Sequence, residues 1–180
     1  TFGLMGAFSF NGNKIVTSGG GGVIVTDNEA LAKRAKHITT TAKVPHRWEF
    51  VHDEVGYNYR MPNINAALLV AQLEQLEGFL QNKRATAKAY EEFFATHDIA
   101  TFVKEPKNAK SNYWLETVRF ESKEQREAFL TISNDSGVMS RPAWQLMNRL
   151  EAFKDAPCEE IPNALLLEEQ LVNIPSGVRV

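Results

Sequence analysis

The sequence has little of several features that would assign a protein to a specialised class. It contains one cysteine, Cys158, so an internal disulfide is impossible, and its four histidines show no metal-ligand spacing. No run of 18 apolar residues occurs, which argues against a membrane-spanning helix. With 20 basic and 22 acidic residues and no basic cluster, a nucleic-acid partner is not expected. We therefore predict no metal site, no membrane or nucleic-acid partner, and a reducing, cytoplasmic location.

The first ten residues predict a strand that needs neighbours. Thr1–Phe10 is apolar, aromatic and spaced by glycines, a composition typical of a strand buried inside a sheet. The chain opens with threonine, and no signal peptide is visible. We expect the neighbouring strands to precede Thr1, so that the chain is the C-terminal part of a longer protein.

A strand pair and a helix are expected next. Val23–Thr26 is β-branched and follows the four glycines Gly19–Gly22, which indicates a strand, a glycine turn and a second strand. Asp27 or Asn28 would then cap a helix at about residues 28–38, because a short polar side chain at that place accepts a hydrogen bond from the first turn. Residues 39–59 show no sustained period and predict a long functional loop.

The remaining elements form a helix and a second module. A leucine stripe at 69, 73, 76 and 80 predicts one long or kinked helix that opens at Pro62 with Asn63 or Asn65. The polar stretch 97–110 contains a proline and marks a predicted boundary. Beyond it we expect an α+β module whose elements are a strand at 113–120, a helix capped by Ser122, a strand near Val138, and short helices near 144–153 and 163–171.

Lys14 lies between the first strand and the glycine run. A lysine in that setting is partly desolvated, which favours a neutral amine able to bond to an aldehyde. The Ser9 hydroxyl and nearby backbone N–H groups could hold a phosphate, and Gly19–Gly22 let the backbone approach a flat ligand. The spacing fits neither a Walker loop nor a dinucleotide fingerprint. A hairpin with a solvated lysine fits the pattern equally well.

A second group of polar residues, Gly56–Arg60, precedes the helix that opens at Pro62. Gly56 permits a positive φ, and the Tyr-Asn-Tyr-Arg side chains would lie at a helix N-terminus, where anions are favoured. On the pattern alone, a structural role is the better-supported alternative: Tyr59 as a packed aromatic and Arg60 in a buried ion pair.

Taken together, these motifs resemble one family. They are Phe8–Phe10 with Lys14, Thr17–Gly22, Gly56–Pro62, Ala66–Leu73 and Asn173–Gly177. They resemble the pyridoxal-phosphate-dependent sugar aminotransferases of the DegT/DnrJ/EryC1/StrS type, nearly end to end. Within that family the sequence, including Ser140–Met147, most resembles enzymes that aminate UDP-linked 4-keto sugars for legionaminic-acid-type surface glycans.

The resemblance implies an α/β fold that is the C-terminal half of a fold-type I pyridoxal-phosphate-dependent transferase. Residues 1–96 would be the end of the large mixed-sheet cofactor domain, with the Schiff-base lysine and the long helix, and residues 97–180 the small α+β domain. The groups that pair with the pyridine nitrogen and stack on the ring would precede Thr1. One departure is Gly20, where the family commonly has a glutamate, and it leaves the role of that loop open.

The resemblance also implies the site residues and partners. Lys14 would bond to pyridoxal 5'-phosphate and then act as the general acid and base of the proton shift. Ser9 would bind the cofactor phosphate, and Asn58 would reach the phosphate in the other subunit of a homodimer with shared active sites. The residues that would shape the substrate side are Tyr57, Tyr59, Arg60, Arg141 and Trp144.

The implied activity is transfer of an amino group, from an amino-acid donor such as glutamate, to a keto group of a nucleotide-linked deoxysugar in surface glycan or lipopolysaccharide biosynthesis. One alternative is a non-transaminating sugar dehydrase of the same fold, although in the dehydrase considered a histidine takes the place of Lys14. Another, for these residues alone, is a non-catalytic dimerisation module.

Overall fold

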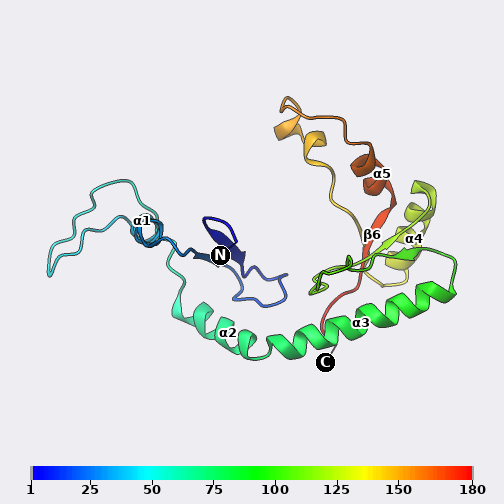
Figure 1. The fold of residues 1–180 in the computed structure, drawn as a ribbon, viewed down its shortest axis with the longest axis horizontal. Coiled ribbons are helices and arrows are strands. Elements are labelled where there is room, and N and C mark those ends of the chain that lie inside the picture. Colours follow the sequence, from blue (N-terminus) through cyan, green and yellow to red (C-terminus); the bar gives the residue numbers. More distant parts are fainter. Residues whose placement is uncertain (1, 180) are drawn as a thin grey trace. The chain divides into compact units, whose positions relative to one another are not determined.

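The computed structural model describes residues 2–179, and the chain forms two compact units that divide after Leu76 (Figure 1). The functional domain boundary that the sequence predicts, after residue 96, stays a prediction. The second unit holds nearly all of the long helix, and each unit is described by itself.

The first unit begins with a two-stranded antiparallel sheet. β1 (Gly6–Ser9) pairs with β2 (Gly22–Val25), so that Gly6 lies opposite Val25 and Ser9 opposite Gly22. The predicted strand, glycine turn and strand are therefore confirmed. The predicted burial of β1 is not observed: Ala7, Phe8 and Ser9 are exposed, because this sheet has only two strands among the described residues.

α1 (Glu29–Thr39) follows as predicted, and Asn28 is its cap. The Leu31 backbone N–H donates to Oδ1 of Asn28 at 3.1 Å, which satisfies one of the free N–H groups of the first turn. Glu29 lies in the first turn and His37 in the last, the arrangement that the helix dipole favours.

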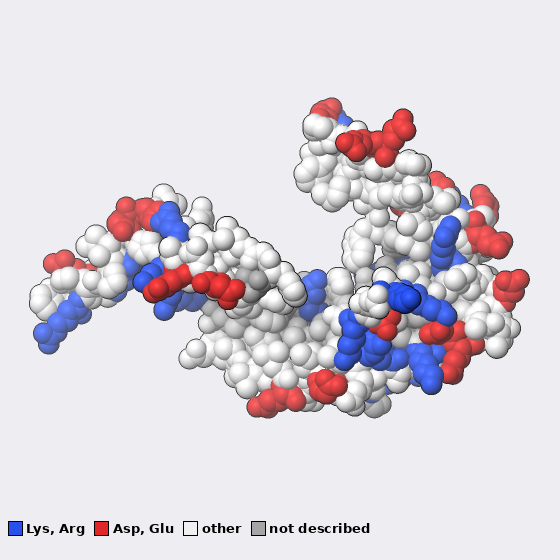
Figure 2. Space-filling model, viewed as in Figure 1, with Lys and Arg blue, Asp and Glu red and all other residues white. Residues whose placement is uncertain are grey.

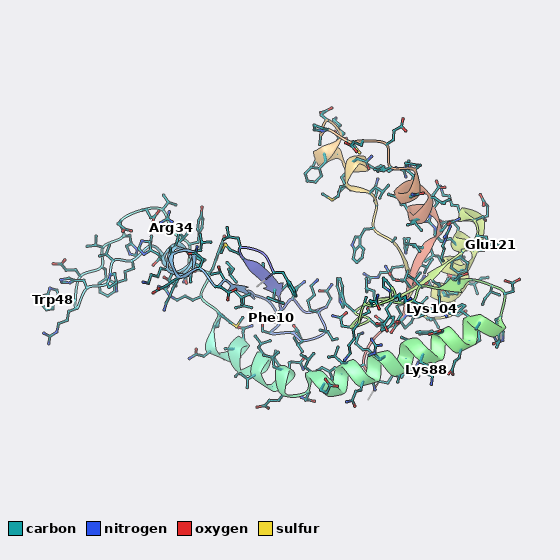
Figure 3. All side chains as sticks on the ribbon, viewed as in Figure 1. Phe10, Arg34, Trp48, Lys88, Lys104 and Glu121 are labelled. Atoms are coloured by element: carbon teal, nitrogen blue, oxygen red, sulfur yellow. The ribbon has the colours of Figure 1, made fainter. Side chains whose placement is uncertain are left out.

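The long loop after α1 extends away from this helix and then folds back toward it. Isolated bridges join Thr40 to Asn58 and Lys43 to His52, so the two arms of the loop lie side by side near α1. Trp48 lies toward the outer end of the loop, away from Arg34 on α1 (Figure 3), and its indole is exposed.

An ion pair and a hydrogen bond hold the returning arm against α1. The Arg34 guanidinium donates to both carboxylate oxygens of Glu54, and the resulting charge-assisted bonds hold the pKa of Glu54 below its ordinary value. Nε2 of His37 lies 2.7 Å from Oδ1 of Asp53, and this hydrogen bond lowers the pKa of Asp53. The loop that precedes Gly56 is thus tied to α1 by side chains.

The predicted kinked helix is confirmed as two helices in succession. α2 (Asn63–Glu74) is followed by its C-cap residue Gln75, and α3 (Leu76–Thr96) begins at the next residue. Gly78 lies inside α3 and does not cause the break. The helix opens where the sequence predicts, since α2 begins at Asn63 directly after Pro62, and no side-chain cap bond forms at its start.

The second unit is an antiparallel sheet with helices, as the sequence predicts in outline. Its strand order is β3 (Thr101–Phe102), β4 (Glu116–Arg119), β6 (Leu171–Ile174) and β5 (Arg141–Pro142), and its other elements are α4 (Lys123–Asp135), η1 (Met147–Arg149), η2 (Glu151–Phe153) and α5 (Pro162–Gln170). Ser122 caps α4, as predicted. The strand expected near Val138 lies instead at Arg141–Pro142, and the helix expected at 144–153 is a pair of 3-10 turns.

The core of the second unit lies between its sheet and α3. Its buried apolar residues are Ala87, Phe102, Val118, Phe120, Val172 and Ile174, with Tyr90 and Phe94 packed against them. Acidic and basic side chains are interspersed over the visible surface of each unit (Figure 2). In the part of the chain that the structure describes, no helix is both long enough and apolar enough to cross a membrane.

Candidate active site

Lys14 lies in a closed loop that joins β1 to β2. The Phe10 N–H donates to the Gly21 carbonyl at 2.9 Å, and the Ser18 N–H donates to the Phe10 carbonyl at 3.0 Å, so the base of the loop is held on both sides. Within it, the Lys14 N–H donates to the Asn11 carbonyl at 3.0 Å, which closes a four-residue turn. Lys14 is half-buried on this turn.

The shape of the loop depends on its glycines. Gly19 and Gly21 have φ values of 79° and 92°, a region that side chains with a Cβ rarely adopt. At Gly22 a Cβ would lie 2.5 Å from the carbonyl oxygen of Phe8 across the strand pair. The Ser18 hydroxyl is buried and donates to the Gly20 carbonyl. The backbone therefore requires Gly19, Gly21 and Gly22, whereas at Gly20 nothing lies within 4 Å of a Cβ.

Ser9 is the last residue of β1, and its side chain is exposed. Its Oγ accepts one hydrogen bond, from the Asn11 N–H at 3.4 Å, and among the described residues it donates none. A hydroxyl in that state can donate to an anion.

The backbone of the 57–60 motif pairs with the end of α1. The Tyr57 N–H donates to the Ile38 carbonyl at 2.7 Å, and the Tyr59 N–H donates to the Thr39 carbonyl at 2.9 Å. Gly56 does not have the positive φ that the sequence suggests. It is needed for a close approach, because a Cβ there would lie 2.5 Å from the backbone nitrogen of Ala42.

The side chains of this motif face solvent. The rings of Tyr57 and Tyr59 stack with centroids 5.3 Å apart, and Tyr59 is 72% exposed. Arg60 donates to Oδ1 of Asn58 at 3.1 Å and to the Thr40 carbonyl at 2.8 Å. The alternative of a packed Tyr59 and a buried Arg60 ion pair is thus not what the structure shows. The exposed side chains remain accessible to a ligand or a partner.

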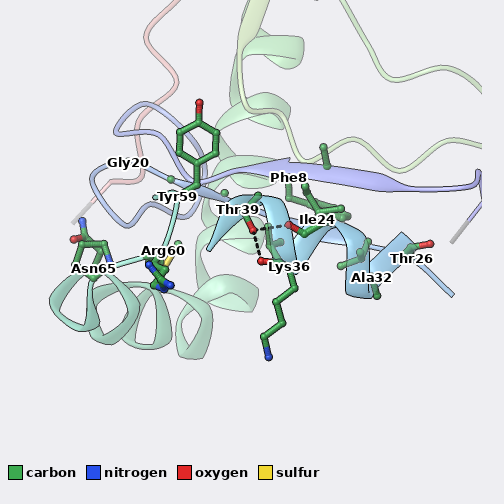
Figure 4. A pocket seen from close by; sticks show the side chains of 18 residues that line it. Phe8, Gly20, Ile24, Thr26, Ala32, Lys36, Thr39, Tyr59, Arg60 and Asn65 are labelled. Atoms are coloured by element: carbon green, nitrogen blue, oxygen red, sulfur yellow. Dashed lines mark hydrogen bonds between the residues drawn. The ribbon is translucent and has the colours of Figure 1, made fainter. Parts of the chain in front are cut away.

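A cavity of about 940 Å³ lies between the strand pair, α1 and the start of α2. Figure 4 shows Tyr59 and Arg60 at one end of it with Gly20 and Asn65, and Thr26 and Ala32 toward the other end. Of the predicted site residues, only Tyr59 and Arg60 line this cavity, whereas Ser9, Lys14, Tyr57 and Asn58 do not.

Sequence reasoning missed the role of Asn65. Its Nδ2 donates to the Ser18 carbonyl at 2.5 Å and so joins α2 to the glycine loop. The sequence pattern gives Asn65 only a place at the opening of the helix that follows Pro62. Only the folded chain brings Ser18 within reach of it.

Arg141 and Trp144 belong to the second unit. Arg141 begins β5 opposite Asn173, and Trp144 is 68% exposed. The Trp144 indole stacks on Trp114, with centroids 6.4 Å apart and an angle of 29° between the rings. Trp114 was not a predicted site residue, because residues thirty positions apart give no local signal of contact.

Comparison with solved structures defines the class of fold. The chain superimposes on the aminotransferase TlmJ of Streptoalloteichus hindustanus with a TM-score of 0.91 and 24% identity, over all of this chain and 48% of that one. It superimposes on Helicobacter pylori PseC, an aminotransferase of pseudoaminic acid biosynthesis, with a TM-score of 0.91 and 19% identity over 99% and 49%. The predicted mixed α/β fold of pyridoxal-phosphate-dependent aminotransferases is thereby confirmed.

Sequence comparison gives the family. Residues 1–180 match the DegT/DnrJ/EryC1/StrS aminotransferase family, and the chain belongs to that family. It is 34% identical to GDP-perosamine synthase of Escherichia coli O157:H7 over 176 residues, which cover 98% of this chain and 47% of that enzyme. It is 33% identical over 156 residues to the putative pyridoxal phosphate-dependent aminotransferase EpsN of Bacillus subtilis, covering 87% of this chain and 40% of that protein. The chain spans about half the length of these relatives.

Proposed function

We propose that this chain contributes the lysine-bearing part of a pyridoxal-phosphate-dependent aminotransferase that acts on a nucleotide-linked keto sugar. The observation that carries the proposal is the position of Lys14. It lies on a glycine-dependent loop five residues after an exposed serine hydroxyl, in a chain that matches the family throughout. Lysine at position 14 does not favour the dehydrase alternative.

The residues present fit the cofactor by the chemistry of their donor groups. The cofactor has an aldehyde and a phosphate, which require an amine and hydrogen-bond donors. Lys14 supplies the amine, and Ser9 supplies a hydroxyl with an unused donor. Solved structures with the same fold include pyridoxal-phosphate and pyridoxamine-phosphate forms of a putative sugar aminotransferase from Streptococcus pneumoniae.

The proposed reaction assigns a task to each of these residues. Bound pyridoxal phosphate supplies an electron-withdrawing ring that stabilises negative charge on the reacting carbon. Nζ of Lys14 would hold the cofactor covalently and, once displaced by the amino donor, remove and return the proton on that carbon. Ser9 and Asn58 would bind phosphate oxygens, with Asn58 acting in the partner's site of a homodimer.

The side chains proposed to contact the substrate are all exposed. Tyr57, Tyr59 and Arg60 offer two stacked rings and a cation, and Arg141 and Trp144 offer the same two chemistries. A guanidinium suits a diphosphate and an indole suits a planar ring. Relatives are named both for GDP-linked perosamine and for a UDP-linked amino sugar, so the proposal covers nucleotide-linked keto sugars as a class.

The exposed cysteine Cys158 is compatible with the proposed cytoplasmic location.

The test is a Lys14→Ala variant of the full-length protein. We expect loss of more than 99% of transamination with little change in melting temperature, because the role of the lysine is covalent. Borohydride reduction followed by mass spectrometry should add the cofactor mass to the Lys14 peptide of the unmodified protein. Lys33→Ala, which removes an exposed amine paired with Glu29, is the control and should keep full activity. Turnover by Lys14→Ala, or cofactor mass on another lysine, would refute the assignment.

A further inference from the structure

Glu116 occupies a core position that an apolar residue would normally fill. It precedes Val118 on the buried face of β4, the buried Phe120 follows the end of the strand, and Glu116 is 0% exposed. Neither carboxylate oxygen has a hydrogen-bond partner. A buried carboxylate without hydrogen bonds is costly, whereas a neutral carboxylic acid is far less so.

Lys83 of α3 is the basic group whose charge acts on Glu116, and it is 5% exposed. Its Nζ donates to the carbonyl of Ser176 and, at 3.4 Å, to the carbonyl of Trp114. No ion pair within 4.0 Å joins it to Glu116 in the described part of the chain. The ammonium is therefore engaged with two backbone carbonyls and not with the carboxyl group.

Other side chains of α3 also bind the C-terminal segment that contains the Ser176 carbonyl. α3 binds the C-terminal segment Pro175–Arg179 through the Tyr90 hydroxyl, which donates to Pro175 at 3.0 Å. Asn82 accepts from the Arg179 N–H at 2.8 Å and donates to its carbonyl at 3.0 Å. Lys83 lies between these two contacts in the sequence of α3.

The other groups around Glu116 add little charge. β6 and β3 present Val172, Ile174 and Phe102, which are apolar. Among titratable groups, α3 presents Lys83 and Tyr90, and the C-terminal segment presents Arg179, which acts on Tyr90. Lys83 is thus the group that responds most directly to the charge of Glu116.

We propose that Glu116 and Lys83 form a buried, proton-controlled switch that sets how firmly Pro175–Arg179 is held on α3. While Glu116 carries a proton, the Lys83 ammonium stays on the carbonyls of Trp114 and Ser176. When Glu116 loses its proton to solvent, the new carboxylate attracts that ammonium. The Ser176 carbonyl then loses the lysine donor, and the Trp114 carbonyl keeps only the hydrogen bond from the Ser176 hydroxyl at 3.0 Å.

The electrostatic environment supports this arrangement. Burial raises the pKa of Glu116 to about 7, against an ordinary value of 4.5, although the charge of Lys83 opposes the rise. Burial likewise lowers the pKa of Lys83, while Glu116 raises it. A raised carboxyl pKa in the folded state means that stability falls as pH rises from 4.5 to about 7, and then levels off.

The experiment compares the full-length protein with Glu116→Gln, whose amide imitates the protonated acid. Near pH 6, infrared difference spectra should show a protonated carboxylic acid that is missing in the variant. Between pH 4.5 and about 7, the melting temperature should fall more in the unmodified protein than in the variant, and above that range the difference should stay constant. Amide hydrogen exchange at 175–179, corrected for its intrinsic pH dependence, should increase only in the unmodified protein.

Glu105→Gln is the matched control. Glu105 accepts two hydrogen bonds from Arg84, which together with the Ser111 N–H lower the pKa of Glu105 to about 2, so this variant should remove no carboxylic-acid band. Lys83→Met should increase exchange at 175–179 at every pH, independently of whether Glu116→Gln folds well. Parallel melting curves without an acid band, or unchanged exchange in Lys83→Met, would overturn the proposal.

Discussion

Asn58 is held in place by its local contacts, and we propose that its side chain acts at the site of a partner subunit. Its Oδ1 accepts from Arg60, and its backbone forms a bridge with Thr40, so it is held in place without being buried. A side chain held in this way needs little ordering when it binds an anion. Its two amide N–H groups make no hydrogen bond among the described residues, which suits a phosphate ligand.

We expect Asn58→Ala to weaken cofactor binding by about 1.5 to 3 kcal/mol, because a hydrogen bond to a charged phosphate is stronger than a neutral one. Equilibrium dialysis of pyridoxal phosphate measures the change. Asn63→Ala, in the first turn of α2, is the control and should bind normally. Heterodimers of Lys14→Ala and Asn58→Ala subunits should be more active than either homodimer, since one of their two sites would be intact. Activity no higher than that of the homodimers would contradict a shared site.

Replacement of glycine by alanine should have opposite effects on stability at Gly56 and at Gly78. At Gly56 a Cβ would lie 2.5 Å from backbone atoms of Thr41 and Ala42, so Gly56→Ala should destabilise the protein by about 1 to 3 kcal/mol and displace the 57–60 motif. At Gly78, inside α3, nothing lies within 4 Å, and Ala should stabilise by about 1 kcal/mol. Urea denaturation of both variants is the measurement. A neutral Gly56→Ala would mean that the loop can move away from α1.

At the scale of elements, helix ends are determined locally. Both Asn28 and Ser122 accept a hydrogen bond from a backbone N–H three residues ahead, and both precede helices that the sequence places correctly. Such contacts involve four consecutive residues, so the surrounding fold has little influence on them.

We expect Ser122→Ala to lower the free energy of unfolding by about 1 kcal/mol, because the Gln125 N–H loses its acceptor at 3.3 Å. Chemical denaturation monitored by circular dichroism measures the loss. Thr131→Ala on the same helix is the control: its hydroxyl donates to the Glu127 carbonyl at 2.9 Å, a bond that does not stabilise a helix. Equal losses in both variants would show that the cap has no specific effect.

At the scale of the whole molecule, the two units differ in how well they bury their apolar residues. The second has a core of six buried apolar side chains, whereas the first exposes Phe8 and Ile24 on its strand pair and Phe2 and Leu4 ahead of it. A two-stranded sheet without further strands is marginally stable in water. We therefore predict that another surface covers these side chains in the full-length protein.

We predict that residues 1–180 expressed alone will associate into oligomers and bind pyridoxal phosphate weakly at most. Exposed apolar patches of this kind drive association, at roughly 25 cal/mol for each Å² that is buried. Light scattering across a concentration series is the measurement, and residues 77–180 expressed alone offer a comparison. A monomer with one cooperative thermal transition would contradict the prediction.

The sequence by itself determined the features that depend on neighbouring residues. The strand pair around Gly19–Gly22, the cap residues Asn28 and Ser122, and the Lys14 loop follow from local backbone preferences and short spacings. The family also follows from motifs that are each a few residues long. These features need no knowledge of which distant segments meet.

Only the tertiary structure decided which distant segments meet. The two-residue strands β3 and β5 are too short to show a period, and they exist because β4 and β6 offer free edges to them. The contacts of Asn65 with Ser18, Trp114 with Trp144, and Lys83 with Trp114 and Ser176 join residues 30 to 93 positions apart. Glu116 looked like an ordinary strand residue, and only packing against α3 made it a buried acid, because desolvation depends on everything that surrounds the group in space.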